Sequence, residues 1–219
     1  MNSTLILDQA AMPLIMGICC LLPAEQVGEV VTVIAEEEGR LGVMSLTEAE
    51  GTPHCIELRR LTRLALHIDR HRLDRTVLPI YQGREQLMAG AAALLDDDVT
   101  LACVDAMRLL ALQLDKLLRG GRGSTQAKLD GLTLSVMEQR ALAAQSPNTG
   151  AVVRGSWRRK TRNQLGRGNW LDVVEAALWC FWHSDTLQDG EALLGALLGA
   201  DIRVRVVYGM LAGAFYLED

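Results

Sequence analysis

Several features that mark common classes of protein are missing from this chain of 219 residues. No apolar stretch reaches the roughly 20 residues that cross a bilayer, and the run from Ala10 to Leu22 is too short. The five cysteines are odd in number and contain no CxxC pair, which argues against a disulfide framework or a zinc knuckle. Free, buried thiols in a reducing cytoplasm are the simplest interpretation, so we expect a cytoplasmic protein without membrane contact.

Sequence signatures of common catalytic sites are missing as well. The chain has no GxSxG nucleophile elbow, no HExxH metal motif and no glycine-rich phosphate loop after a strand. His67 and His71 are four residues apart and would share a helix face, but without a third ligand nearby they are more typical of a surface than of a metal site.

Positive charge is scarce and concentrated. The formal net charge is −5 and no long basic run occurs, so a broad nucleic-acid-binding surface is not expected. The one basic segment carries five arginines and one lysine between positions 154 and 167: Arg154, Arg158, Arg159, Lys160, Arg162 and Arg167. It is either a solvated loop or a phosphate-binding loop, because guanidinium groups pair bidentately with phosphate.

Apolar residues recur at helical spacing in four segments. The positions are Val27, Val30, Val31 and Ile34; Val104, Met107, Ala111, Leu114 and Leu118; Trp170, Val173, Val174, Ala177, Leu178 and Phe181; and Val204, Val207, Tyr208, Leu211 and Phe215. Gly39 and Gly120 follow two of them as stop signals. Because strand-like alternation is rare, we predict an all-α, multi-helix protein, with loops at 120–124 and 145–168.

The C-terminal third carries a specific motif. A helix beginning near Gly168 contains Asp172 and the run 175–179 (Glu-Ala-Ala-Leu-Trp), a Ser-Asp turn follows at 184–185, and a last helix contains the run 208–216 (Tyr-Gly-Met-Leu-Ala-Gly-Ala-Phe-Tyr). A weaker match is the run 103–110, which begins Cys-Val-Asp-Ala. Together these runs resemble the second half of an ADP-ribosylglycohydrolase, over roughly residues 97–219.

The resemblance implies an all-α fold that holds two Mg²⁺ ions and hydrolyses the bond between ADP-ribose and a protein side chain or a related acceptor. The match suggests an unassigned helical region at 1–72 and an ADP-ribosylglycohydrolase-like region at 73–219, forming one compact domain that is truncated or divergent on its N-terminal side. A second copy of the chain could cover the missing half, so a homodimer is one expectation.

The family's metal-binding motifs are degenerate in this sequence. Its Thr-Asp-Asp-Thr motif is absent, and its Asp-Ala-Asp-Thr motif is reduced to Asp201, followed by Arg203 and Arg205. One carboxylate cannot supply the octahedral oxygen shell of Mg²⁺, and two fixed positive charges oppose a dication. We therefore expect no metal cofactor and treat Asp201 as a single remnant of the metal site.

Ligand binding could survive the loss of metal. By the resemblance, Gly168, Asn169 and Trp170 open the helix that lines the ADP-ribose pocket, where Trp170 could stack on a base and free N–H groups could receive phosphate. Arg203 and Arg205 could replace the metal as phosphate partners. The competing interpretation for Trp170 is a core residue, as regular apolar spacing indicates for Trp179 and Phe181.

Three functions remain open on sequence grounds. The first is a pseudoenzyme that binds ADP-ribose, an ADP-ribosylated protein or a partner protein without catalysis. The second is an active Mg²⁺-dependent hydrolase whose missing ligands come from the N-terminal region, for instance Glu36, Glu37, Glu38 or Glu57. The third is a helical interaction protein with a purely structural role.

Overall fold

Every regular element that the structure describes is helical, as the sequence predicts. The computed structural model describes residues 12–39, 53–73, 80–95, 99–166, 168–197 and 201–217. The α-helices are α1 (Pro13–Cys19), α2 (Ala24–Glu37), α3 (Pro53–Leu73), α4 (Ile80–Ala93), α5 (Leu101–Arg119), α6 (Thr125–Leu132), α7 (Val136–Leu142), α8 (Thr149–Val153), α9 (Trp170–Trp182), α10 (Leu187–Leu197) and α11 (Ile202–Tyr216). Two short 3₁₀ turns, η2 (Ser156–Arg158) and η3 (Arg162–Gln164), precede α9.

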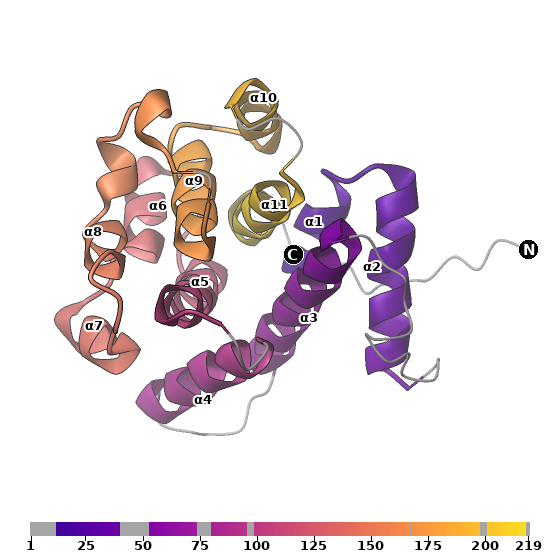
Figure 1. Ribbon diagram of the computed structural model, residues 1–219, viewed down its shortest axis with the longest axis horizontal. Coiled ribbons are helices and arrows are strands. Elements are labelled where there is room, and N and C mark those ends of the chain that lie inside the picture. Colours follow the sequence, from indigo (N-terminus) through magenta and orange to yellow (C-terminus); the bar gives the residue numbers. More distant parts are fainter. Residues whose placement is uncertain are drawn as a thin grey trace, which may run out of the picture.

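Helix α11 is the centre of the molecule. It packs against α1, α3, α5, α9 and α10, and Figure 1 shows it surrounded by these neighbours. Every residue from 206 to 215 is buried. A helix that is apolar on all sides needs such a position, because each of its faces must be covered. The segment 202–206, which could be read as strand or helix from sequence, is therefore helical and begins this central element.

Three glycines allow α1 and α11 to cross at backbone contact. A Cβ on Gly17 would lie 2.7 Å from the Cα of Gly213, and a Cβ on Gly209 would lie 2.8 Å from the carbonyl oxygen of Gly17. A Cβ on Gly213 would overlap the carbonyl oxygen of Pro13. Glycines four residues apart on α11 thus serve close packing inside the core.

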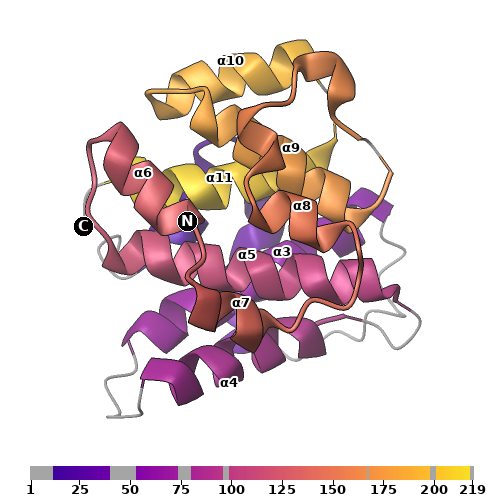
Figure 2. The same ribbon diagram turned by 90° about the vertical axis from the view of Figure 1, so that its left-hand side faces the viewer.

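The helices are stacked in layers. Figure 2 shows α4, α5, α11 and α10 one above another, and each adjacent pair is in contact. The 19-residue helix α5 begins at Thr100, whose side chain accepts a hydrogen bond from the backbone N–H of Cys103, and it ends before Gly120. Because α3 also contacts α5 and α11, the region before residue 73 packs directly on the region after it.

The segment 145–168 is more ordered than its composition predicts. It contains α8, η2 and η3, so the prediction of a single loop is wrong here. The buried Asp105 holds its start by accepting hydrogen bonds from the backbone N–H of Ser146 (2.7 Å) and the hydroxyl of Thr149 (2.8 Å). Trp157 is buried and packs edge-on against Trp182 of α9, with ring centroids 5.5 Å apart. This segment is held by hydrogen bonds to a buried carboxylate and by tryptophan packing. It lacks the periodic apolar residues by which longer helices are predicted.

Two further sequence predictions need correction or restriction. Of the five cysteines, which all have free thiols, only Cys103 and Cys180 are buried, so the expectation of buried thiols holds for two of them. Arg167 of the basic segment lies outside the described residues. Within the described ranges, no helix is both long and apolar enough to cross a membrane.

Candidate functional site

The predicted ligand residues lie at the N-terminal ends of α9 and α11. Asn169 caps α9: its side chain accepts a hydrogen bond from the N–H of Asp172 at 3.0 Å. In return, the carboxylate of Asp172 accepts from the N–H groups of Gly168 (3.1 Å) and Asn169 (3.3 Å). A phosphate at these two N–H groups would therefore have to displace the carboxylate of Asp172. The later N–H groups of the first turn of α9 are better placed to donate hydrogen bonds to an anion.

Trp170 and Arg203 connect the two helix ends. Trp170 is only 9 % exposed, and the guanidinium of Arg203 lies 5.7 Å from the centre of its ring. That geometry is a cation–π contact between α9 and α11. The structure thus brings Trp170 and Arg203 together, and it places Trp170 largely within the core with one face held by Arg203.

Asp201 is paired with Arg203 and caps α11. Its two carboxylate oxygens accept from Nε (3.2 Å) and Nη2 (3.0 Å) of Arg203, and Oδ1 also accepts from the Arg203 backbone N–H (3.0 Å). Burial alone would raise the pKa of Asp201, but these interactions with Arg203 outweigh burial and lower it below its ordinary value. The hydrogen bond to Asp201 and the nearby charge of Glu57 raise the pKa of Arg203 despite burial.

Arg205 points elsewhere. Its guanidinium donates to the carbonyl oxygen of Leu21 (3.2 Å) and lies 3.5 Å from a carboxylate oxygen of Glu191. Its side chain therefore ties α11 to the segment that follows α1 and to α10, whereas its backbone N–H donates to the carbonyl oxygen of Asp201 at 3.3 Å.

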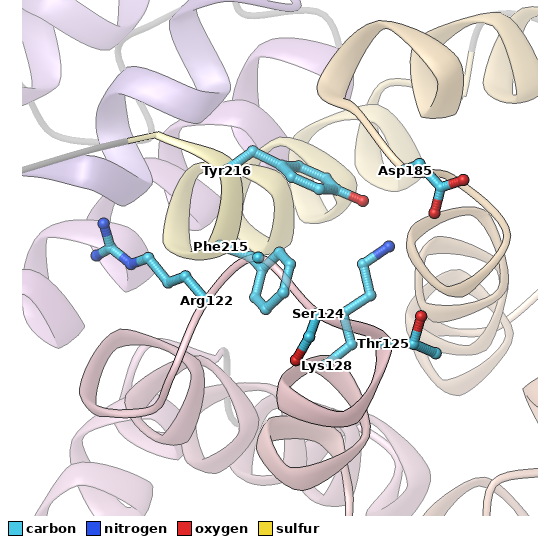
Figure 3. Close-up of a pocket in the computed structure, with 8 residues that line it drawn as sticks. Arg122, Ser124, Thr125, Lys128, Asp185, Phe215 and Tyr216 are labelled. Atoms are coloured by element: carbon cyan, nitrogen blue, oxygen red, sulfur yellow. The ribbon is translucent and has the colours of Figure 1, made fainter.

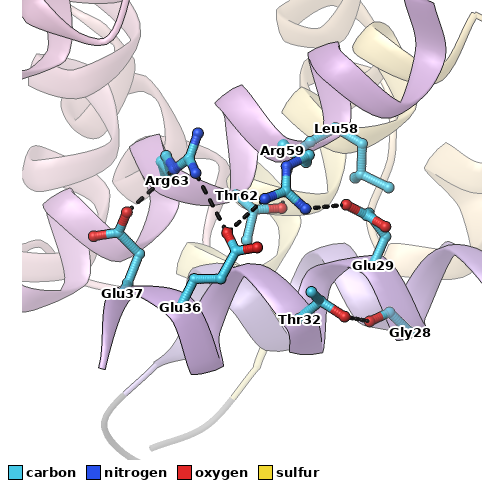
Figure 4. Close-up of polar contacts among 9 residues, drawn as sticks. All are labelled: Gly28, Glu29, Thr32, Glu36, Glu37, Leu58, Arg59, Thr62 and Arg63. Carbon is cyan, nitrogen blue, oxygen red and sulfur yellow. Dashed lines mark hydrogen bonds and ion pairs between the residues drawn. The ribbon is translucent and has the colours of Figure 1, made fainter. Parts of the chain in front are cut away.

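The carboxylates that could complete a metal site lie in an arginine cluster between α2 and α3. Figure 4 shows Arg59 between Glu29 and Glu36, and Arg63 between Glu36 and Glu37. Glu36 is buried, and Arg63 Nε lies 3.1 Å from Glu37. These acids are neutralised by arginine and hold two helices together, which explains why Glu36 faces the interior.

The fit of a dinuclear magnesium site to these residues is poor. Glu57 is in ion-pair contact with Arg60 at 3.3 Å, and both oxygens of Asp201 are engaged by Arg203. Within the described ranges, no three His, Cys, Asp or Glu side chains are grouped so that they could hold a metal ion. Hard oxygen ligands that are each bound to arginine do not provide the charge that Mg²⁺ requires.

A separate cavity of about 610 Å³ lies at the opposite ends of α9 and α11, and sequence analysis did not find it. Figure 3 shows Lys128 of α6 reaching into it, with Asp185 and the ring of Tyr216 nearby. Lys128 is only 4 % exposed and donates hydrogen bonds to the carbonyl oxygens of Phe181 (2.9 Å) and Ser184. Lys128 belongs to α6 but binds carbonyl oxygens at the end of α9. Such a contact leaves no periodic pattern in the sequence, so the sequence does not predict this site.

The basic segment combines a lysine with a structural role and several exposed arginines. Lys160 is in ion-pair contact with the buried Glu175 at 2.6 Å, which fastens the segment to α9. Arg154, Arg159 and Arg162 are exposed. Lys160 thus has a structural role, whereas the exposed arginines fit the solvated interpretation, and the phosphate-binding alternative stays a prediction.

His67 and His71 lie on α3 facing α4, and both line a cavity of about 350 Å³. Burial lowers the pKa of His67, whose Nε2 lies 3.2 Å from the carbonyl oxygen of Leu87. Their four-residue spacing thus places them at a helix interface rather than on an open surface.

Comparison with known proteins agrees with the family that the sequence motifs resemble. The chain is similar to an ADP-ribosylarginine hydrolase. That protein, ADP-ribosylarginine hydrolase Tri1 of Pseudomonas putida (strain GB-1), is 32 % identical over 114 residues. The alignment covers 52 % of this chain but only 28 % of the hydrolase. No family model matches the chain.

Proposed function

We propose that this chain is an ADP-ribosylglycohydrolase-like protein that binds ADP-ribose, free or attached to a protein, without a metal ion and without hydrolysing it. The likeness to ADP-ribosylarginine hydrolase Tri1 supports the ligand class. The observation that carries the proposal is the Asp201–Arg203 pair beside Trp170, where the resemblance implies metal-binding carboxylates. A cytoplasmic location and a homodimer remain part of this proposal.

Arg203 supplies the positive charge that the metal would otherwise bring. A guanidinium can exchange its bidentate contact with Asp201 for one with a phosphate, because both partners offer two oxygens in the same geometry. When Arg203 moves to a phosphate, the face of Trp170 that it covers becomes available to a base or ribose. Hydrolysis needs an activated water, and the carboxylate of this cluster that could act as a general base, Asp201, has both oxygens engaged by Arg203.

Calorimetric titration with ADP-ribose, with and without excess Mg²⁺, tests the proposal. We expect binding that is independent of Mg²⁺ and that weakens by about tenfold or more in Arg203→Ala, the effect of losing a charged hydrogen bond. Binding that requires Mg²⁺, or release of free ADP-ribose from a modified arginine substrate, would instead support the active hydrolase.

Asp201→Asn is the matched variant. Asparagine can still cap α11, but it no longer neutralises Arg203. We therefore expect Asp201→Asn to retain or strengthen ADP-ribose binding, whereas a metal ligand at this position could not be replaced without loss. If ADP-ribose binds in neither condition, the helical interaction protein becomes the better account.

A further inference from the structure

The cavity between α6, α9 and α11 has no role in the proposed function. It lies where α9 and α11 end, whereas the Asp201–Arg203 cluster lies where they begin. Its lining includes charges of both signs, hydroxyl groups and aromatic rings: Lys128, Asp185, Ser124, Thr125, Phe215 and Tyr216. Such a mixture of convergent polar groups and an aromatic wall is typical of a small-molecule site.

Lys128 is fixed from three sides. The carbonyl oxygens of Phe181 and Ser184 accept two of its hydrogens, and its Nζ lies 4.8 Å from the ring centre of Phe181 and 5.0 Å from that of Tyr216. An ammonium group has three hydrogens, so one remains for the cavity that Lys128 lines. The rings and carbonyl oxygens favour the charged form, whereas burial lowers the pKa of Lys128.

Asp185 faces the same cavity with the opposite charge. It is exposed, and it acts on Lys128 through its charge rather than through a hydrogen bond. Figure 3 shows the two side chains directed toward a common space, with the hydroxyls of Thr125 and Tyr216 beside it. A lysine and an aspartate that face each other without touching are matched by a ligand that carries both charges.

We propose that this cavity binds a small zwitterion of the α-amino-acid class, with its carboxylate on Lys128 and its ammonium on Asp185. The two groups sit on one carbon in such a ligand, so one small molecule can contact both of the oppositely charged side chains that line the cavity. The rings of Phe215 and Tyr216 form part of the wall beside which the ligand side chain would lie. Tyr216 is itself held in place, because its hydroxyl donates to the carbonyl oxygen of Ser184 at 2.8 Å.

Calorimetric titration of the whole chain with glycine, L-leucine and L-arginine tests the site. We expect at least one of the three to bind, and its N-acetyl and its amide derivatives, which each lose one charge, to bind at least about tenfold more weakly. Absence of binding to all three at millimolar concentration would overturn the proposal. Equal binding of the N-acetyl derivative would show a simple anion site and would overturn it as well.

Asp185→Asn should weaken binding by about tenfold or more, because it removes the partner of the ligand ammonium. The side chain is exposed, so the variant is expected to fold. Asp189→Asn is the control: Asp189 also raises the pKa of Lys128 through its charge but does not line the cavity, so binding should stay unchanged. An equal loss in both variants would contradict a direct contact with Asp185.

Discussion

At the scale of single residues, the most unusual group is Asp69 of α3. Its side chain is fully buried, and the backbone N–H groups of Leu14 and Ile15 at the start of α1 lie near its carboxylate without reaching the geometry of a normal hydrogen bond. Burial raises the pKa of Asp69 to about 7, against the opposing influence of Arg72 and the α1 backbone. The carboxyl group is therefore protonated in the folded protein at mildly acidic pH.

This pKa predicts how stability depends on pH. The unfolded chain ionises Asp69 near pH 4 while the folded chain holds the proton to about pH 7, so the unfolded state is favoured increasingly between these values. The cost reaches up to about 4 kcal/mol at pH 7 and above and is absent below pH 4. Asp69→Asn removes it, so the stability gained over the wild type should grow from pH 4 to pH 7 in urea unfolding.

The exposed Asp189→Asn variant is the control for this series, and its stability should follow the wild type at each pH. A constant difference between Asp69→Asn and wild type across the range would mean that Asp69 ionises normally in the folded protein.

At the scale of helices, alanine substitutions at a glycine of the α1–α11 crossing and at an exposed glycine of α2 should change the free energy of unfolding in opposite directions. Gly213→Ala places a methyl group against the Pro13 carbonyl oxygen and 2.9 Å from the Gly17 Cα, and backbone atoms cannot yield cheaply. We expect a loss of about 3 kcal/mol in the free energy of unfolding. Gly28→Ala on the exposed side of α2 meets nothing within 4 Å and should instead stabilise by roughly 0.5–1 kcal/mol. Urea titration of both variants checks the prediction.

The arginine cluster between α2 and α3 gives a second matched pair. Glu36→Ala leaves Arg59 buried with one partner fewer and should cost about 3 kcal/mol, whereas Glu37→Ala, at a side chain that is 35 % exposed, should cost about 1 kcal/mol or less. Thermal unfolding distinguishes the two. If Mg²⁺ stabilises the wild type but not Glu36→Ala, then Glu36 is a metal ligand after all.

The long helices could be predicted from sequence because their packing is periodic. Helices α9 and α11 bury every apolar position that the 3.6-residue spacing selects, and α5 buries all of them except Val104. In α2 the buried residues are Val30, Val33, Ile34 and Glu36. The buried face of this helix is therefore rotated relative to the predicted one, which included Val27 and Val31. The reason is the salt bridge of Glu36 with Arg59, and a contact between distant charges leaves no periodic trace.

The candidate site was harder to predict than the helices around it. Sequence motifs pointed to Trp170, Asp201 and Arg203, and the structure brings Trp170 and Arg203 into contact. Side chains two residues apart do not face each other within a helix. Asp201 and Arg203 can pair because Asp201 lies just outside α11, as its N-terminal cap. Lys128 was missed because its partners on α9 are more than fifty residues away.

At the scale of the whole molecule, α11 joins the regions before and after residue 73 into one packed body. Its contacts with α1 and α3 and with α5 and α9 place apolar residues of both regions in one hydrophobic core. We therefore expect a single cooperative thermal transition, with equal calorimetric and van't Hoff enthalpies. Two separate transitions would show that the regions fold independently.

The glycine crossing also bears on the order of events during synthesis. Roughly 200 residues separate Gly17 from Gly213, and a ribosome adds about 5–20 residues each second. The apolar side chains of α1 must therefore wait about 10–40 s for the helix that covers them. During that interval the nascent chain exposes an apolar segment that chaperones can bind. The α1–α11 contact forms only after α11 has left the ribosome.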